Sequence, residues 1–252
     1  MLGMLPPVAT APITEPWPLA AILQGWTAMK LETVDIRQAA SAADIVYEAL
    51  RKAIIEGELA EGENLRQDQI ASLFNTSRIP VREALSRLEQ NGLITTQRYK
   101  GAVVAGLSIE EIEEIFEFRA LIEAEVIRLA VPNMNAKTLD MARRHCAAFD
   151  SEANSAKWGE INRNFHYSLY EAARRPYYLQ IVRASLDRID RYLRAQLTLT
   201  DGMNRARREH QGILDACIEG NADKAADLTR DHILGAGRAL VTFLEETRGK
   251  ND

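Results

Sequence analysis

Apolar residues recur every three to four positions along most of the chain from residue 41 onward, a spacing that predicts helices. The first helix is expected from about Ser41 to Gly57, where glycine ends it. Its apolar stripe is expected to comprise Ile45, Val46, Ala49, Leu50, Ala53 and Ile54. A turn-rich segment, 58–64, separates it from the next helix.

A second helix is expected at about 67–74, with Ile70, Leu73 and Phe74 facing inward. After a short polar turn, a third helix should run from Ser77 to Asn91 and stop at Gly92. Ser77 can cap this helix, and a proline is tolerated in the first turn because its missing N–H costs nothing there. The buried face is expected to consist of Val81, Ala84, Leu85 and Leu88.

The opposite face of this third helix carries Arg78 and Arg82, which are four residues apart and therefore adjacent on the surface. A helix that buries one face and presents two arginines near its start suits DNA recognition, although two solvated charges would give the same pattern. The next segment favours DNA binding. Two β-prone stretches, 93–97 and 102–105, flank a basic turn and predict a hairpin of the wing type.

Six helices with short connections are expected in the rest of the chain, and no strand. Ser108 and Glu111 have the spacing of a capping box at the start of the first. The expected ranges are 108–130, 136–150, 155–173, 177–198, 202–219 and 222–247. The fold class predicted is mainly α: an N-terminal winged helix-turn-helix followed by an antiparallel helical bundle.

The first 40 residues break this pattern. Five of the eight prolines lie there, without a helical period or the basic start of a secretory signal. We expect residues 1–40 to be disordered or loosely ordered, and Met29 is an alternative start of translation. The remaining division is 41–107 for a DNA-binding domain, with its helix-turn-helix at about 67–86, and 108–248 for a helical domain.

Composition narrows the class of protein. The 252 residues are 46% hydrophobic and 27% charged, as in globular proteins, and no apolar run is long enough to cross a membrane. The net charge of −5 requires any DNA-binding surface to be local, and residues 76–104 carry five positive and two negative side chains. Cys146 and Cys217 are far apart, so we expect buried thiols in a cytoplasmic protein.

Three histidines fall on apolar stripes of three different predicted helices: His166, His210 and His232. One such histidine is usually a core residue, but three directed at one bundle interior are how helical proteins build metal sites. Imidazole favours zinc, nickel or copper. Arg119 lies on the apolar stripe of the first long helix; Glu123 can pair with it, or it can bind the carboxylate of a ligand.

Residues 41–105 resemble the DNA-binding domain of GntR-type regulators. The resemblance rests on 55–57, on 77–85 (Ser-Arg-Ile-Pro-Val-Arg-Glu-Ala-Leu), on 91–94 and on the hairpin at 100–104. It implies base contacts from Arg78 and Arg82, phosphate contacts near Thr76 and Ser77, and groove contacts from Lys100 and Gly101. Glu61 and Asp68 depart from the usual pattern, and Asp68 is expected to repel phosphate.

Residues 110–240 resemble the all-helical ligand domain, called FCD, found in one branch of that family. The resemblance implies an obligate dimer, a cavity for a small organic acid bound at Arg119, and often a metal ion. The metal ligands it implies are His166, His210 and His232, with Asn162 at a position where the family has aspartate. An amide oxygen is neutral and a weaker ligand than a carboxylate.

The function that follows is transcription regulation, most simply repression, of a gene with a palindromic operator, controlled by an organic acid with a bound divalent metal (zinc or nickel). The partners are double-stranded DNA, a small carboxylate and a second copy of the chain, with no membrane. A ligand-free dimeric DNA-binding protein is the alternative. A metal-dependent hydrolase is a remote one, since the HExxH motif and the nucleophile elbow are both missing from the sequence.

Overall fold

Ser41 begins the first described helix by closing a capping box with Asp44. In the computed structural model, which describes residues 41–152, 154, 157–199 and 202–248, helix α2 (Ala42–Glu56) follows directly. The Ser41 side chain accepts from the Asp44 amide at 3.1 Å, and the Asp44 carboxylate accepts from the Ser41 amide at 3.1 Å. Gly57 ends the helix with φ of 77°, a conformation that glycine adopts without strain.

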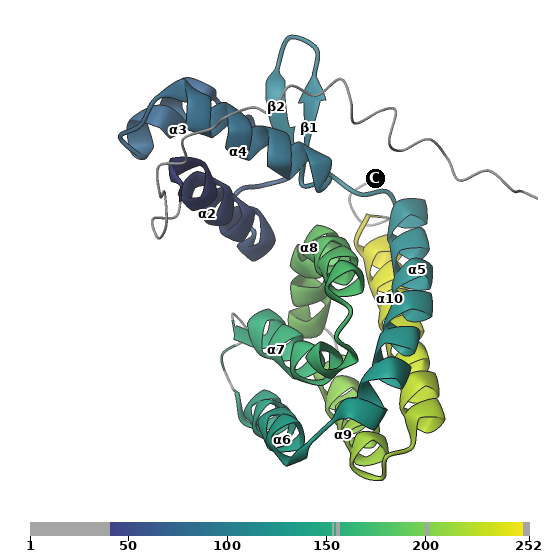
Figure 1. Ribbon diagram of the computed structural model, residues 1–252. Coiled ribbons are helices and arrows are strands. Elements are labelled where there is room, and N and C mark those ends of the chain that lie inside the picture. Colours follow the sequence, from purple (N-terminus) through teal and green to yellow (C-terminus); the bar gives the residue numbers. More distant parts are fainter. Residues whose placement is uncertain (1–40, 153, 155–156, 200–201, 249–252) are drawn as a thin grey trace, which may run out of the picture. The chain divides into compact units, whose positions relative to one another are not determined.

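Helices α3 (Gln67–Leu73) and α4 (Arg78–Gln90) form the helix-turn-helix (Figure 1). The predicted buried face of α4, from Val81 to Leu88, is confirmed. Ser77 occupies the N-cap position, but its side chain makes no capping bond, contrary to our expectation. A capping hydroxyl bonds to the second or third amide of a helix, and the third residue here is Pro80, which has no N–H.

Strands β1 (Ile94–Gln97) and β2 (Gly101–Val104) pair in antiparallel register, with Ile94 opposite Val104. This is the predicted hairpin, and an isolated bridge from Asn64 to Val103 adds to its edge. Leu93, Ile94 and Val104 join the apolar core beneath α2 and α4, which anchors the hairpin while its turn remains exposed.

Two expected core positions in this domain are wrong. Ile45 is 53% exposed and Leu73 is 80% exposed. The buried side of α2 is instead rotated toward Ala43, Val46 and Tyr47, and α3 buries only Ile70 and Ala71. The two-turn helix α3 has too few apolar positions for its spacing to fix which side faces the core. On α2, Ile45 belongs to the edge of the apolar stripe, where Ala49 and Ala53 are also only half-buried.

The rest of the described chain is helical, as predicted, and begins at a second capping box formed by Ser108 and Glu111. The helices are α5 (Ile109–Ala130), α6 (Ala136–Ser151), α7 (Trp158–Tyr170), α8 (Pro176–Leu199), α9 (Gly202–Ile218) and α10 (Ala222–Arg248), with 3-10 turns at Val131–Asn133 and Glu171–Ala173. α7 begins at Trp158, and its expected start at residue 155 lies outside the described residues; its last predicted turn is a 3-10 turn.

Helices α5 and α10 run side by side in opposite directions along most of their length (Figure 1). Gly237 allows this approach, because a Cβ atom there would lie 2.8 Å from Cγ of the Phe116 ring. The main cores of the bundle lie between α5, α6, α7, α8, α9 and α10. Both cysteines are free and buried, as expected, and burial raises the pKa of Cys217 to about 12.

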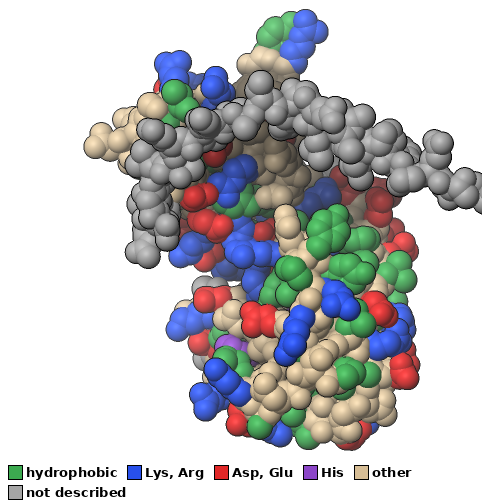
Figure 2. All heavy atoms as spheres, in the orientation of Figure 1, with side chains coloured by type: hydrophobic (Ala, Val, Ile, Leu, Met, Phe, Trp, Pro, Cys, Tyr) green, Lys and Arg blue, Asp and Glu red, His purple; other side chains and the backbone are tan. Residues whose placement is uncertain are grey.

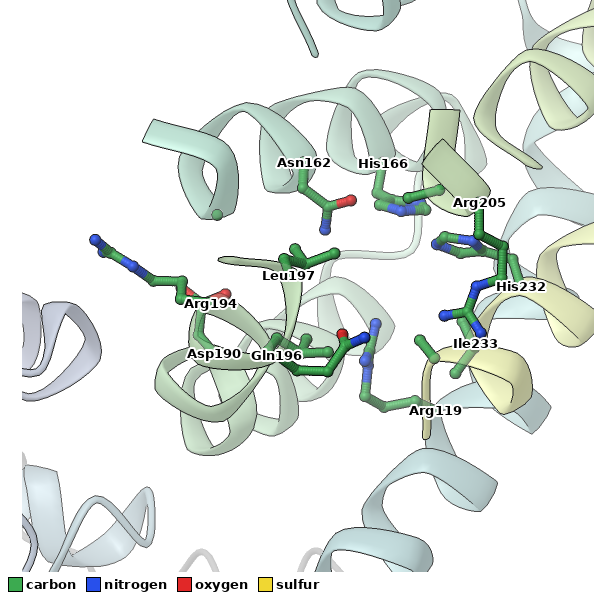
Figure 3. Close-up of a pocket in the computed structure, with 14 residues that line it drawn as sticks. Arg119, Asn162, His166, Asp190, Arg194, Gln196, Leu197, Arg205, His232 and Ile233 are labelled. Carbon is green, nitrogen blue, oxygen red and sulfur yellow. The ribbon is translucent and has the colours of Figure 1, made fainter. Parts of the chain in front are cut away.

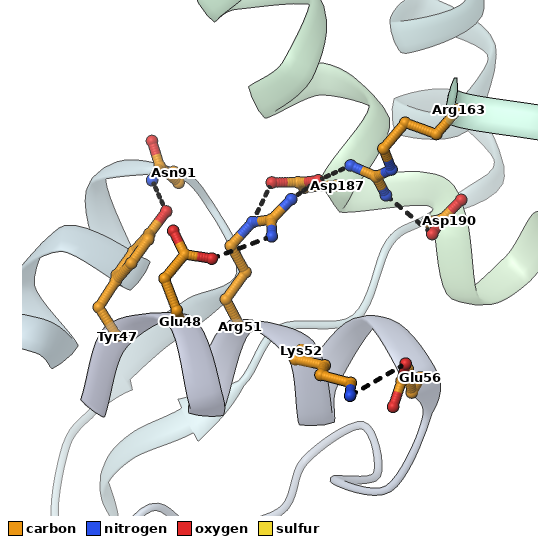
Figure 4. Close-up of polar contacts among 9 residues, drawn as sticks. All are labelled: Tyr47, Glu48, Arg51, Lys52, Glu56, Asn91, Arg163, Asp187 and Asp190. Atoms are coloured by element: carbon orange, nitrogen blue, oxygen red, sulfur yellow. Dashed lines mark hydrogen bonds and ion pairs between the residues drawn. The ribbon is translucent and has the colours of Figure 1, made fainter. Parts of the chain in front are cut away.

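Buried ion pairs connect α2 to α7 and α8 (Figure 4). The Arg51 guanidinium donates to both carboxylate oxygens of Asp187, at 2.5 Å each. Arg163 of α7 donates to the same Asp187 at 2.5 Å and to Asp190 at 2.9 Å. We call these four residues the ion network. Its two positive and two negative charges balance, which is the condition for burying them.

The expected disorder of residues 1–40 and the alternative start at Met29 lie outside the described residues. Among the described helices, none has the length and apolar character needed to cross a lipid bilayer.

The ion network yields a stability prediction. Asp187→Asn leaves Arg51 and Arg163 facing a neutral amide, and removing one partner of a buried ion pair costs about 3 kcal/mol. We expect the free energy of unfolding, measured by urea denaturation, to fall by about that amount. Glu56→Gln is the matched control, because its partner Lys52 lies 4.0 Å away at the surface of the same helix. Equal losses in both variants would contradict the role assigned to the network.

Candidate functional site

The residues expected to contact DNA gather at the start of α4 and at the hairpin turn. Ser77, Arg78 and Arg82 are exposed, and Thr76 is half-buried in the turn before the helix. Lys100 and Gly101 are exposed at the tip of the hairpin. Figure 2 shows Lys and Arg side chains at this tip and at the end of the helix-turn-helix. The geometry permits DNA contact from both places, and the individual contacts stay predictions.

Asp68 forms an ion pair with Arg78. The carboxylate on α3 therefore holds one recognition arginine, in addition to the repulsion of phosphate expected from the sequence. Both side chains are about 70% exposed, so the pair adds little stability and can open when DNA arrives. Glu61, the other departure, accepts a hydrogen bond from Tyr192 at 3.0 Å. The Tyr192 hydroxyl also accepts from the Leu107 amide just before α5, at 2.9 Å, and Tyr192 is not part of the cavity wall described below.

Two exposed apolar side chains in the same region were missed. Ile79 lies between the recognition arginines and is 68% exposed, and Tyr99 at the hairpin turn is 91% exposed. Tyr99 also has a positive φ of 68°. The exposure of Ile79 could have been predicted from the sequence, because an apolar residue outside the buried face of α4 has to face solvent or a partner. Arg87, by contrast, is held by Asp44 and packs over the Tyr47 ring.

His166 of α7, His210 of α9 and His232 of α10 converge in the bundle interior, as the three apolar stripes predicted. One ring nitrogen from each lies within 4.8 Å of the others, and all three residues are buried. This histidine cluster can therefore hold a metal ion. Neighbouring rings enclose it: Phe149 and Phe165 lie 4.7 and 4.5 Å from the His210 ring, measured between centroids.

Hydrogen bonds at the outer nitrogens orient two of the rings. His232 Nδ1 lies 2.7 Å from a Glu209 carboxylate oxygen, and His166 Nδ1 lies 3.3 Å from the Tyr170 hydroxyl. In both rings this leaves Nε2 available as a ligand atom. A second hydrogen-bonding layer of this kind is the usual support for metal-binding imidazoles.

His210 supplies the test of whether a metal fits. The residue is 0% exposed, and neither of its ring nitrogens has a hydrogen-bond partner among the described residues. A buried polar atom without a partner is costly, and a ligand bond to a metal would satisfy one of these nitrogens. Two oriented imidazoles and one unsatisfied imidazole fit a borderline metal such as zinc.

Burial keeps the rings of His166 and His210 neutral. It lowers the pKa of His166 well below its usual 6.5, and His232 and Arg119 lower it further. Burial likewise lowers the pKa of His210, with added effects from His232 and His166. Neutral imidazole is the form that binds metal. Burial and Glu123 raise the pKa of Tyr170, so its hydroxyl keeps its proton.

A small cavity adjoins the cluster (Figure 3). His166 and His232 form one part of its wall, and Asn162 lies one turn before His166 on α7. Arg119 enters from α5, pointing toward the same space as Asn162 in Figure 3. The other polar side chains of the wall are Asp190, Arg194, Gln196 and Arg205. The structure therefore brings together Asn162, two of the histidines and Arg119, which are four of the five predicted sensing residues.

Arg119 has the intramolecular partner considered from the sequence. Its Nε donates to Glu123 at 2.6 Å, and the two residues are 5% and 1% exposed. Glu123 also accepts from Tyr170 at 2.9 Å. Arg119 nevertheless lines the cavity. The bond to Glu123 uses the Nε–H group, and the guanidinium has four further N–H groups that can bind a ligand. Pairing with Glu123 and binding a ligand are compatible.

Glu209, Arg205, Asp190, Arg194 and Gln196 were missed as site residues. They lie on α8 and α9, where each is one of several charged or polar residues at helical spacing. Which of these faces the cavity depends on how the helices pack, and nothing in the local sequence marks them. Tyr170 lies behind His166 and is not part of the cavity wall.

The lowered pKa values predict how stability depends on pH. In the unfolded chain His166 and His210 take up protons below about pH 6.5, whereas in the folded protein they stay neutral. Stability therefore falls as the pH drops below 6.5, with a slope that approaches about 1.4 kcal/mol per pH unit for each such histidine as it becomes fully protonated in the unfolded chain. Urea denaturation of chelator-treated protein at several pH values between 7.5 and 5.5 measures this slope.

His210→Phe removes one of these protonation sites while keeping an aromatic ring between Phe149 and Phe165. Its slope below pH 6.5 should be shallower than that of the unmodified protein by about 1.4 kcal/mol per pH unit. His145→Gln, which changes a half-buried histidine outside the cluster, is the control. An unchanged slope in His210→Phe would show that His210 is not kept neutral by burial.

Comparison with known proteins identifies the two parts of the chain. Residues 42–104 match the family described as bacterial regulatory proteins, gntR family, and residues 114–235 match the FCD domain. The chain is 26% identical over 209 residues to the uncharacterised HTH-type transcriptional regulator BphR of Paraburkholderia xenovorans, covering 79% of this chain and 85% of that one. It is 29% identical over 201 residues to the HTH-type transcriptional repressor GlaR of Escherichia coli, covering 75% and 90%.

Among solved structures, a transcriptional regulator of the GntR family from Pseudomonas syringae pv. tomato is 30% identical, with a TM-score of 0.53, and covers 84% of this chain and 89% of its own. These relatives are transcriptional regulators rather than enzymes, in agreement with the expected function. The chain therefore belongs to the GntR family of bacterial transcriptional regulators and carries an N-terminal GntR helix-turn-helix and a C-terminal FCD domain.

Proposed function

We propose that this regulator is a cytoplasmic, homodimeric repressor whose affinity for a palindromic operator is controlled by a small organic acid. The observation that carries the proposal is that one chain combines an exposed pair of arginines at the start of α4 with a buried cavity lined by histidine and arginine. The working division is 41–107 for DNA binding and 108–248 for sensing and dimerisation, with the helix-turn-helix at about 67–86.

In this proposal the DNA contacts come from Thr76, Ser77, Arg78, Arg82, Lys100 and Gly101. Arg78 and Arg82 can each hold a guanine edge with two hydrogen bonds, whereas the hydroxyls and the hairpin tip position the domain on the backbone. Two copies related by a two-fold axis would address the two halves of a palindrome. Exposed Phe118 and Leu121, one turn apart on α5, provide apolar surface of the kind that a second copy can cover.

On the sensing side, we propose that Asn162, His166, His210 and His232 hold a divalent metal, with zinc or nickel best suited to the imidazoles. Arg119 then binds the carboxylate of the effector. Such a metal would act as a fixed positive charge that attracts the acid. What the chain itself contributes is orientation, through Glu209 and Tyr170 behind the histidines, and exclusion of water, through the aromatic rings.

The ion network offers a route between the two sites. Asp190 lines the cavity, Arg163 follows Asn162 in sequence, and both connect through Asp187 to Arg51 of α2. An acid that moves Asn162 or Asp190 would therefore alter the ion pair between Asp187 and Arg51, which lies in the DNA-binding domain. Such coupling requires that the acid and the operator each bind one arrangement of the protein more tightly than another. Repression is favoured because GlaR is a repressor.

Selection from random DNA tests the proposal, followed by binding of the enriched sequence with and without organic acids. We expect one palindrome to be enriched and its affinity to change with at least one acid. If no sequence is enriched and DNA binding depends only on the salt concentration, the chain is a nonspecific DNA-binding protein. Enrichment without any response to acids, and no shift in melting temperature with them, would favour the ligand-free dimeric DNA-binding protein.

Replacing Arg82 with alanine tests the recognition face. The side chain is exposed, so folding should be unaffected, whereas operator affinity should fall at least tenfold, because one bidentate base contact contributes about 1–3 kcal/mol. Fluorescence anisotropy with labelled operator measures the loss. Arg143→Ala is the matched control, since it removes an equal charge from an exposed position on α6. Operator binding by Arg82→Ala equal to that of the control would exclude this assignment.

A further inference from the structure

The donors available to a metal at the histidine cluster are all neutral. The cluster itself consists of three imidazoles, and no carboxylate among the described residues belongs to it. The nearest further donor on α7 is Asn162, an amide, one turn from His166 in the cavity wall. A divalent ion held by this set would keep its full charge of two in a buried site, which is unfavourable without an anion nearby.

The carboxylates closest to the cluster already have partners. Glu209 accepts from His232 Nδ1 and therefore lies behind the ring, on the side away from the cluster. Glu123 accepts from both Arg119 and Tyr170. Asp190 is bound to Arg163, and its burial raises the pKa of this carboxyl group. None of these three can approach the cluster without breaking a buried hydrogen bond.

Positive groups surround the same space. Arg119, Arg194 and Arg205 line the cavity, and Arg119 is near enough to lower the pKa of His166. Arg205 donates to the Gly235 carbonyl at 2.7 Å and lies 3.6 Å from Glu209. A divalent ion would therefore add charge to a wall that already carries three guanidinium groups and one carboxylate. The missing component is an anion that reaches both the metal and Arg119.

We propose that the metal and the carboxylate ligand bind as a pair: the ligand's carboxylate supplies the anionic donor that Asn162 does not, and Arg119 holds its other oxygen. The inference rests on the proposed function and specifies its chemistry. It makes the metal weakly held without acid and tightly held with acid. Arg119 lies on the side of the cavity opposite Asn162 and His166, so a small carboxylate bound in that space would lie between them (Figure 3).

The linkage has a direct thermodynamic consequence. If the carboxylate tightens metal binding by some factor, the metal tightens carboxylate binding by the same factor. A neutral molecule of the same shape supplies no charge and should produce no such effect. Acetate and acetamide form this pair of probes, since they differ only in the group that would bind the metal and Arg119.

The experiment measures zinc affinity by competition with a coloured chelator at about pH 7. Zinc is titrated in sodium acetate, and in acetamide with sodium chloride at equal ionic strength, and the chelator alone is calibrated in each buffer. For the unmodified protein we expect saturating acetate to raise zinc affinity at least tenfold over the acetamide buffer. Equal zinc affinity in the two buffers would overturn the inference, as would a failure to bind zinc in both.

Asn162→Asp places the missing anion in the protein itself. This variant should bind zinc at least tenfold more tightly than the unmodified protein in acetamide buffer, and acetate should change its affinity less than twofold. Arg119→Lys retains the positive charge but not the two-bond geometry, so it should lose most of the acetate effect. Far-ultraviolet circular dichroism checks that both variants are folded. An acetate effect of full size in Asn162→Asp would contradict the assigned role of Asn162.

The outcomes separate this inference from the proposed function. If an acid changes operator affinity while zinc affinity is the same with and without acetate, the proposed control of DNA binding is supported and the pairing of metal and acid is contradicted. If zinc and acetate bind as a pair but no acid alters operator affinity, the pairing is supported and the proposed control of DNA binding falls.

Discussion

Charge in the interior of the helical domain is held mainly in pairs of opposite sign. Arg119 is buried against Glu123, and Arg163 against Asp187 and Asp190. Arg51 of the DNA-binding domain is buried in the same way against Asp187. Buried pairs of this kind add little net stability, because desolvation offsets most of the attraction, but losing one partner is costly. They therefore fix which residues must stay together.

The histidine cluster avoids unpaired buried charge in a different way. The rings of His166 and His210 lie among Phe149, Phe165 and Tyr170, where protonation is unfavourable, so these two rings remain neutral without a carboxylate partner. Neutral imidazoles gathered in one place can bind a cation but cannot balance its charge. This one property connects the proposed metal to the proposed acid, and it makes Asn162 the decisive residue of the cavity.

Much of the architecture could be predicted from the sequence because long amphipathic helices repeat their pattern often enough to fix their buried side. The buried face of α4 and the convergence of His166, His210 and His232 followed from such repeats. The short helix α3 gave too little pattern, and Leu73 was misplaced. Ser77 was expected to cap α4, and the prolyl residue at position 80 removes the amide it would need.

The partners of the functional residues were less accessible to sequence analysis. Arg119 and Glu123 are four residues apart on one helix, so their pairing was foreseeable. Glu209 with His232 and Arg51 with Asp187 are contacts between helices far apart in the chain. Their formation depends on the rotation and packing of whole helices, which local spacing does not encode. The ion network was for this reason not anticipated.

The central claim is that acid binding in the cavity and operator binding by α4 are linked. Calorimetric titration of the effector acid into the free protein and into the protein–operator complex measures this linkage from the side of the acid. Reciprocity requires the acid's dissociation constant to differ between the two by the same factor as the operator's does with and without acid. We predict weaker binding of the acid to the operator complex, as expected for a repressor released by its ligand. Identical acid affinities in the two titrations would contradict the account.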